Sequence, residues 1–292
     1  MRLFKSLVRF FSIFTVLLGV LLTFCYISRE MDLVIQRYSI KSEKLSRGFS
    51  YHALVLSDYH NHGLEYRNES LLDAIESENP DSLFLLGDMV DSHTDSQDLM
   101  VLDSLASFIE EKGYPAYFVS GNHEEDAKNE IRDASYDIYR KRHITILNEN
   151  NQHATLRENN GVSLNVFGFR DPGYWDKDKT GLLVGSAINE QAKTMNLNLK
   201  DFNVLLSHKP SYFEVAKEKG FDLTLSGHTH AGQVDLWGYP LLSLPWTKYK
   251  KGSYIEDGKE LIISNGLGVS YDLPFRFHCP FTLVSVTILG AR

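Results

Sequence analysis

The chain has 292 residues, of which 43% are hydrophobic, 23% charged and 12% aromatic, a composition typical of folded proteins and unlike that of disordered or fibrous chains. Its 30 Lys and Arg residues are outnumbered by 38 Asp and Glu residues, and the net charge of −8 lacks the basic character of dedicated nucleic-acid-binding proteins. The two cysteines, Cys25 and Cys279, are too few for a disulfide framework or a thiolate zinc site, so any bound metal must have nitrogen and oxygen ligands.

The N-terminal region contains an uncharged apolar run over residues 10–28. At about 1.5 Å per helical residue, this run approaches the ~30 Å thickness of the hydrocarbon core of a bilayer. Three basic residues precede the run, but no small-residue cleavage site follows it, which favours an uncleaved anchor over a removed signal peptide. We therefore predict a single-pass transmembrane helix within residues 1–28.

Basic residues flank both ends of this run, so the positive-inside rule does not decide its orientation. Short basic N-termini usually stay in the cytosol, and we expect the rest of the chain on the opposite side of the membrane, which a protease-shaving assay tests. Residues 29–50 have mixed charge and weak patterning. They are predicted to form a juxtamembrane linker, with an edge strand around residues 33–40.

From Tyr51 onward, apolar runs of strand length alternate with helical patterns. The expected strands are 52–57, 82–86 and 116–120. The helices expected after them are 70–78, 97–112 and 126–142. Three successive βα units predict a largely parallel, buried sheet.

The second half continues with an expected strand at 163–169, a helix at 186–198, a strand at 202–207, a helix at 212–219 and a strand at 223–226. Short strands follow around 232–236, 252–256, 261–264 and 281–289. These indicate a second sheet stacked on the first, and we predict one α/β domain over residues 51–292.

Five short polar clusters each follow directly on a strand-like apolar run. They are Ser57-Asp58-Tyr59-His60, Gly87-Asp88-Met89-Val90-Asp91, Gly121-Asn122-His123-Glu124, Ser207-His208 and Gly227-His228-Thr229-His230. Ligands of open α/β sheets bind beyond the carboxyl ends of the strands, so we expect these side chains to meet at one edge. Two carboxylates, one amide and four imidazoles suit two borderline divalent ions such as Mn, Fe, Zn or Co. Two ions ~3.5–4 Å apart need one shared ligand, for which Asp88 is the candidate.

The ordered blocks D-x-H, G-D-x-x-D, G-N-H-E, H and G-H-x-H resemble the calcineurin-like metallophosphoesterase superfamily over about residues 51–288. The resemblance implies a four-layer αββα sandwich of two stacked mixed sheets that binds two divalent metal ions, with Mn favoured over Fe, Zn or Co. It also implies the metal ligands, which are Asp58, His60 and His230 for the first ion, Asn122, His208 and His228 for the second, and Asp88 as the bridge.

The same resemblance assigns His123 to the catalytic imidazole, and Asp91 is the predicted carboxylate that orients its ring. Glu124 occupies a position where many relatives have Asp, and its role is left open. The remaining histidines outside the motifs are interpreted as core or surface residues.

Residues 227–233, GHTHAGQ, resemble the GHTHGGQ form of a bacterial branch of membrane-anchored or exported phosphoesterases. This resemblance implies a manganese-dependent phosphodiesterase of the bacterial cell membrane. The alternatives are a lipid-linked pyrophosphate hydrolase of the UDP-diacylglucosamine type, a phosphomonoesterase, and a non-catalytic protein on the same fold. Arg276 is predicted to clamp the substrate phosphate, with a solvent-facing arginine as the alternative. The aromatic residues Trp175, Trp237 and Trp246 either frame an acyl or sugar group or pack against the sheet edges.

Overall fold

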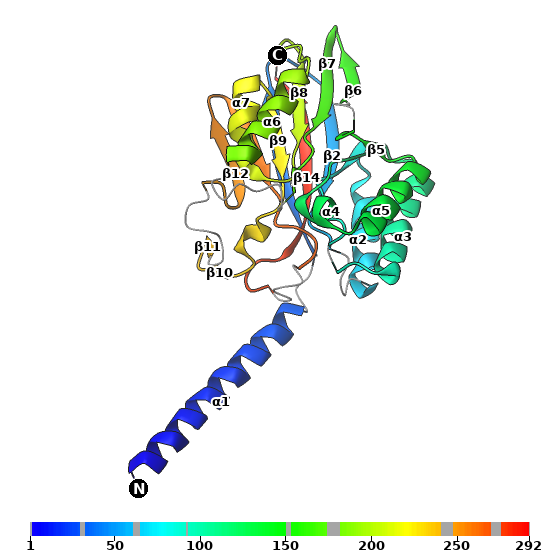
Figure 1. Ribbon diagram of the computed structural model, residues 1–292. Helices are drawn as coiled ribbons and strands as arrows, with labels where there is room; N and C mark the ends of the chain where they lie inside the picture. The colour runs from blue at the N-terminus through cyan, green and yellow to red at the C-terminus, as the bar shows by residue number, and fades with distance from the viewer. Residues whose placement is uncertain are drawn as a thin grey trace.

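The computed structural model describes residues 2–29, 33–60, 65–91, 93–149, 153–173, 182–240, 248–269 and 276–291. The first element is helix α1 (Arg2–Arg29), which extends away from the folded domain (Figure 1). Its 18-residue segment Ser6–Thr23 is long and apolar enough to cross a membrane, and it is completely exposed in the structure. A signal sequence has the same length and composition, so α1 is a candidate for either a membrane span or a signal sequence.

The first sheet contains six described strands in the order β1-β14-β2-β3-β4-β5. Their bounds are β1 (Leu33–Ser42), β14 (Phe281–Gly290), β2 (Ser50–Leu56), β3 (Ser82–Leu85), β4 (Ala116–Phe118) and β5 (Thr145–Ile146). Strands β2 to β5 are parallel, as the succession of βα units predicts, whereas β14 is antiparallel to β2 and parallel to β1. All four residues of β3 are buried, because both faces of this sheet are covered.

The second sheet also contains six described strands, in the order β12-β13-β9-β8-β7-β6. Their bounds are β12 (Gly252–Glu256), β13 (Lys259–Ile263), β9 (Leu223–Ser226), β8 (Phe202–Leu206), β7 (Val162–Gly168) and β6 (His153–Asn159). The four central strands are parallel, and the two edge strands run antiparallel to their neighbours. A separate short hairpin pairs β10 (Asp235–Leu236) with β11 (Tyr239–Pro240).

Three apolar cores separate four layers. The helices are α2 (Glu65–Glu78), α3 (Ser96–Lys112), α4 (Asn122–Asp126), α5 (Asn129–Lys141), α6 (Leu182–Thr194) and α7 (Phe213–Lys219), with short 3-10 turns η1 (Pro210–Tyr212) and η2 (His230–Gly232). One core lies between α2, α3, α5 and the first sheet, a second lies between the two sheets, and a third lies under α6 and α7 (Figure 1). The predicted four-layer αββα sandwich of two mixed sheets is thereby confirmed.

The folded domain differs from the prediction at its beginning. The edge strand predicted around residues 33–40 is observed as β1, but it belongs to the folded domain and not to a linker, because it pairs with β14 over ten residues from Leu33 with Phe281 to Ser42 with Gly290. The domain therefore begins at Leu33 and not at Tyr51. Weak patterning in β1 reflects its edge position, where only Ile40 is buried within the strand.

The helix predicted over residues 126–142 is observed as α5, and a separate short helix, α4, which was not predicted, precedes it. Ala127 has an extended conformation (φ −63°, ψ 156°) and ends α4 after five residues. This break lets α4 carry Asn122 and His123 at the end of β4 while α5 packs against the first sheet. Strand β6 was absent from the prediction because its exposed, polar sequence lacks the apolar run on which the other strands were recognised.

Candidate metal centre

All seven predicted ligands lie at the carboxyl ends of strands, where the two sheets share one edge of the sandwich. Asp58 and His60 follow β2, Asp88 follows β3, Asn122 begins α4 after β4, His208 follows β8, and His228 and His230 follow β9. The structure thus places at one edge residues that are up to 172 positions apart in the sequence, from Asp58 to His230. Loops after parallel strands are the usual location of α/β active sites.

Six of the seven side chains form two clusters whose ligand atoms lie within 4.8 Å of one another. The first cluster contains Asp58, His60 and His230, and its two imidazole Nε2 atoms are 3.1 Å apart. The second contains Asp88, His208 and His228. In that cluster, Nε2 of His208 lies 3.0 Å from a carboxylate oxygen of Asp88.

Asp88 connects the clusters, because it also groups with His60 and His123 within the same 4.8 Å. Its burial leaves 2% of the residue exposed, so both carboxylate oxygens face other polar groups and not bulk water. A carboxylate with two oxygens between two sets of imidazoles suits a ligand that bridges two cations.

Asn122 supplies an independent test of whether these residues fit a metal. Its side-chain oxygen Oδ1 is buried, and it has no hydrogen-bond partner among the described residues. Leaving a buried carbonyl oxygen unpaired costs about 1–3 kcal/mol in a folded protein. A divalent cation coordinated by this oxygen removes that cost, so the donor set fits the predicted second ion.

The ligand loops have an unusual backbone. Five of the seven predicted ligands have positive φ, with values of 51° for Asp58, 50° for His60, 51° for Asp88, 69° for His228 and 47° for His230. Non-glycine residues rarely adopt this region, and such conformations concentrate at functional sites where surrounding contacts maintain them.

Glycine permits the loops to approach one another. Gly87 has φ +81°, and a Cβ atom there would lie 2.1 Å from the backbone nitrogen of Gly121. No L side chain fits this contact, so the loop after β3 meets the loop after β4 only with glycine at this position.

Glu124 joins these two loops, which the sequence did not reveal. Its buried carboxylate accepts hydrogen bonds from the backbone N–H groups of Gly121 (2.8 Å), Asp88 (2.8 Å) and Met89 (2.6 Å). The only local signal was the spacing of a carboxylate three residues after Gly121, which is that of a helix capping box. Glu124 therefore holds the backbone of the candidate bridging residue.

Burial and close charges perturb the titration of this centre. Desolvation raises the pKa of Asp58 to about 6 and lowers the pKa of His60 to about 3. Burial alone would lower the pKa of His208, but the neighbouring Asp88 carboxylate outweighs it and raises that pKa to about 10. Without metal, a buried imidazolium is therefore paired with Asp88, and metal binding requires the loss of that proton.

The ring of His208 is oriented to bind a metal ion through Nε2. Its Nδ1 lies 2.8 Å from the carbonyl oxygen of Leu86, and since a carbonyl only accepts, Nδ1 carries a proton. Nε2 is left facing Asp88 and His228. Such a hydrogen bond at the far nitrogen is typical of metal-binding histidines.

His123 lies at the open side of the centre, with 29% of its side chain exposed and Nε2 4.0 Å from Asp88. Its ring packs edge-on against His60 with centroids 5.0 Å apart. The carboxylate of Asp91 lies 3.9 Å from Nδ1 of His60, a distance too long for a hydrogen bond. That Asp91 orients the ring of His123 stays a prediction.

Arg276 does not have the predicted position of a substrate clamp. Its side chain is completely buried, and its guanidinium donates hydrogen bonds to the carbonyl oxygens of Asn265 (2.6 Å) and Gly268 (2.9 Å). Nη2 lies 2.9 Å from Nδ1 of His230. The guanidinium therefore ties the segment after β13 to a predicted ligand of the first metal.

Replacing Arg276 with Lys distinguishes these two roles. An ammonium cannot reach both carbonyl oxygens in the geometry of the guanidinium, so we expect a loss of about 2 kcal/mol of stability and weaker metal binding. KM for substrate should change little, whereas kcat should fall at limiting metal. Arg140→Lys, at a half-exposed side chain, is the control. A tenfold rise in KM with an unchanged melting temperature would instead show that Arg276 binds the substrate phosphate.

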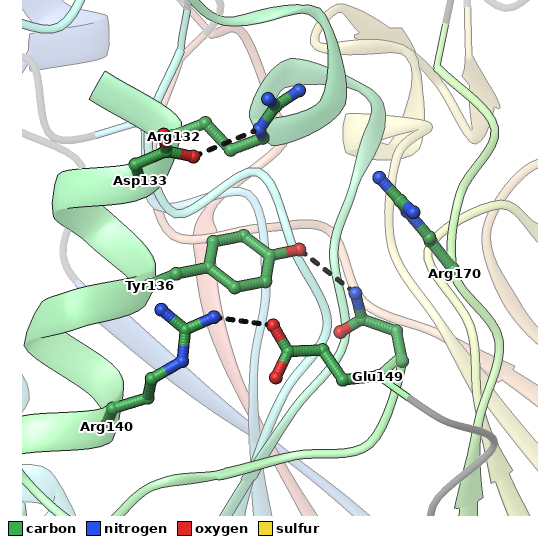
Figure 2. Close-up of a pocket in the computed structure, with 7 residues that line it drawn as sticks. Arg132, Asp133, Tyr136, Arg140, Glu149 and Arg170 are labelled. Carbon is green, nitrogen blue, oxygen red and sulfur yellow. Dashed lines mark hydrogen bonds and ion pairs between the residues drawn. The ribbon is translucent and has the colours of Figure 1, made fainter. Parts of the chain in front are cut away.

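A polar cavity of about 540 Å³ lies beside α5 (Figure 2). Three arginines line it, and each is paired with a carboxylate of this chain. The ion pairs are Arg132 with Asp133 (3.7 Å), Arg140 with Glu149 (2.6 Å) and Arg170 with Glu125 (2.6 Å). Because carboxylates of the same chain balance the three guanidinium charges, we assign these ion pairs a structural role. The pair of Arg170 with Glu125 stabilises the position of α4, to which Glu125 belongs.

The aromatic residues of interest are only partly described. Trp175 and Trp246 lie outside the described residues. Trp237 is 99% exposed and Tyr239 is 60% exposed, so the alternative in which these two pack against a sheet edge is wrong.

Comparisons with known proteins agree with this geometry. Residues 51–232 match the family model described as calcineurin-like phosphoesterase. The chain is 31% identical over 260 residues to an uncharacterized metallophosphoesterase of Aquifex aeolicus, covering 88% of this chain and 92% of that protein. It is 26% identical over 254 residues to the uncharacterized metallophosphoesterase YkuE of Bacillus subtilis, covering 82% and 80%. Phosphodiesterase YaeI of Escherichia coli is 33% identical over 78 residues, covering 26% of this chain and 28% of that protein. With the metal-ligand clusters at the shared sheet edge, these matches establish that the chain belongs to the calcineurin-like phosphoesterase family.

Proposed function

We propose that this chain is a membrane-anchored phosphodiesterase that uses two divalent metal ions, with Mn favoured, to hydrolyse a phosphodiester. The observation that carries the proposal is the pair of clusters that meet at Asp88. Two divalent ions bound there would supply Lewis acidity and lower the pKa of a bound water. Asp58, His60 and His230 would hold one ion, and Asn122, His208 and His228 would hold the other.

The remaining chemistry belongs to His123. Its side chain is 29% exposed and can contact an incoming phosphoester, while six of the seven predicted ligands are buried and His228 is partly buried. From this position Nε2 can donate a proton to the leaving oxygen or, as the cation, neutralise charge on the phosphoryl group. We propose that Asp91 orients this ring.

The test is hydrolysis of bis-p-nitrophenyl phosphate and p-nitrophenyl phosphate by the full chain in detergent, stripped of metal and then supplied with Mn, Fe, Zn or Co. We expect activity to return with metal and to favour the diester. Preference for the monoester would reject the diesterase proposal. Failure to bind any of the four ions would reject the metal centre itself.

His123→Ala should lower kcat about 10²- to 10⁴-fold, because general acid–base groups contribute in that range, while two metal ions remain bound. Metal content by atomic emission and steady-state kinetics are the two measurements. His143→Ala, at a side chain that is 84% exposed, is the control. Loss of metal together with activity would show that His123 is a ligand and not the proton donor.

The diester proposal is supported by the similarity to the E. coli relative, which is named a phosphodiesterase. A second candidate, hydrolysis of a lipid-linked pyrophosphate, is favoured by the exposed apolar helix α1, which suits an enzyme that acts at a membrane. We propose that α1 anchors the chain once in a bacterial cell membrane with the catalytic domain outside the cytoplasm. A vesicle-embedded lipid pyrophosphate, compared with the soluble diester, separates the two substrates.

A further inference from the structure

The anchor enters the domain at the edge that carries the candidate metal centre. Helix α1 ends at Arg29 and β1 begins at Leu33, so four residue steps, at most about 14 Å of chain, separate them. Leu33 pairs with Phe281, the first residue of β14. Because β14 is antiparallel to β2 and their pairing ends at Val284 with Val55, the first residues of β14 lie beyond the carboxyl end of β2. Residues 266–268 connect them to Asp58 there, since Gly266 accepts from Thr282 and Gly268 donates to Asp58.

A short hairpin projects from this same edge. Phe277, shortly before β14, forms backbone hydrogen bonds with Gln233 and Asp235, each of 2.8 Å. These contacts fix the segment that runs from His230 into β10. Figure 1 shows α1 leaving the domain at the end where β10 and β11 lie.

The tip of this hairpin displays aromatic side chains to solvent. Trp237 is 99% exposed and Tyr239 is 60% exposed. Trp237 and Gly238 form the two-residue turn with φ values of 53° and 92°, the pattern in which asparagine and glycine are normally preferred. A bulky tryptophan is strained at this position and receives no packing in return, so internal stability does not explain it.

Positive charge accompanies the aromatic tip. The ammonium of Lys250 lies 5.5 Å from the centre of the Tyr239 ring. Tryptophan and tyrosine are enriched where proteins meet the headgroup region of a bilayer, and lysine is attracted to anionic lipid surfaces. The combination is that of a lipid contact.

We propose that the β10–β11 tip, with Trp237 and Tyr239, inserts into the headgroup region of the bilayer that holds α1, and so turns the metal-centre edge toward the lipid surface. This inference rests on the proposed membrane anchoring by α1. It adds a second attachment point, which limits rotation of the domain about its short connection to the helix.

Tryptophan fluorescence of the full chain tests the proposal, because its only tryptophans are Trp175, Trp237 and Trp246. Phe replaces Trp175 and Trp246, and the protein is reconstituted into vesicles of equimolar phosphatidylcholine and phosphatidylglycerol. Bromine near the headgroup end of the acyl chains should reduce Trp237 emission about twofold, and aqueous iodide should quench it weakly, as at an interfacial aromatic residue.

Ile255→Trp, in a chain lacking the three natural tryptophans, is the matched control. Ile255 is 71% exposed and pairs with Glu260, beside the amino end of β9, so it lies away from the metal-centre edge. Its fluorescence should respond to iodide and not to bromine. Equal responses at the two positions, in protein that floats with the vesicles, would overturn the hairpin contact alone. Protein that does not float would overturn the anchor and this inference with it.

Discussion

Asp88→Asn is expected to abolish metal-dependent phosphoester hydrolysis, with a loss of about a thousandfold or more, because the variant removes the charge shared by both clusters. Asparagine keeps the shape of the side chain and an oxygen to accept the backbone N–H of His123, which Asp88 binds at 2.8 Å. The effect therefore reports the missing carboxylate charge and second oxygen. Metal content should fall from two ions per chain to one or none.

The matched control is Asp133→Asn, whose side chain is 72% exposed on α5. Its activity and metal content should equal those of the unmodified chain. An Asp88→Asn protein that retains two ions and more than a tenth of the activity would contradict the bridging assignment. Circular dichroism of both variants establishes that the fold is intact.

Glu124→Gln is expected to lower stability by about 3 kcal/mol and the melting temperature by about 8 °C. The amide nitrogen of glutamine would face backbone N–H donors that now bind a carboxylate oxygen, and at least one of the donors of Gly121, Asp88 and Met89 would lose its acceptor. Because the loop after β3 is then released, metal affinity should fall as well. Thermal unfolding with and without metal measures both effects.

Two further variants make the result specific. Glu190→Gln changes a 67% exposed glutamate on α6 and should leave melting unchanged. Glu124→Asp keeps the charge and, being one methylene shorter, should recover part of the stability. A Glu124→Gln protein that melts normally but is inactive would indicate that the carboxylate acts on substrate and not on the loops.

The candidate ligands were predictable from sequence because each follows a strand-like apolar run by one to four residues. A buried parallel strand is continuous and apolar, and the edge at which such strands end is shared, so local patterning alone brings Asp58, Asp88 and His208 to one place. The alternation of strand and helix patterns predicted two stacked sheets, and the resemblance to the metallophosphoesterase superfamily implied the four layers.

The partners of the buried polar groups were not predictable in this way. Arg276 donates hydrogen bonds to carbonyl oxygens and lies beside His230 instead of facing substrate, and Glu124 binds the backbone of two loops. A hydrogen bond depends on distances of a few tenths of an ångström between loops that are far apart in sequence, and no periodicity records those distances.

The amino-acid sequence was sufficient to show that each motif follows a strand, which donor atoms the motifs supply and therefore which class of metal suits them. These properties depend on local pattern and side-chain chemistry. The strand after the apolar helix was predicted, but the fold alone shows its partner, because β1 pairs with β14 from the opposite end of the chain. Strand pairing at a sheet edge is set by the neighbouring strand and not by the edge strand's own polar sequence. That pairing places the apolar helix, the Trp237 hairpin and the candidate metal centre at one end of the domain.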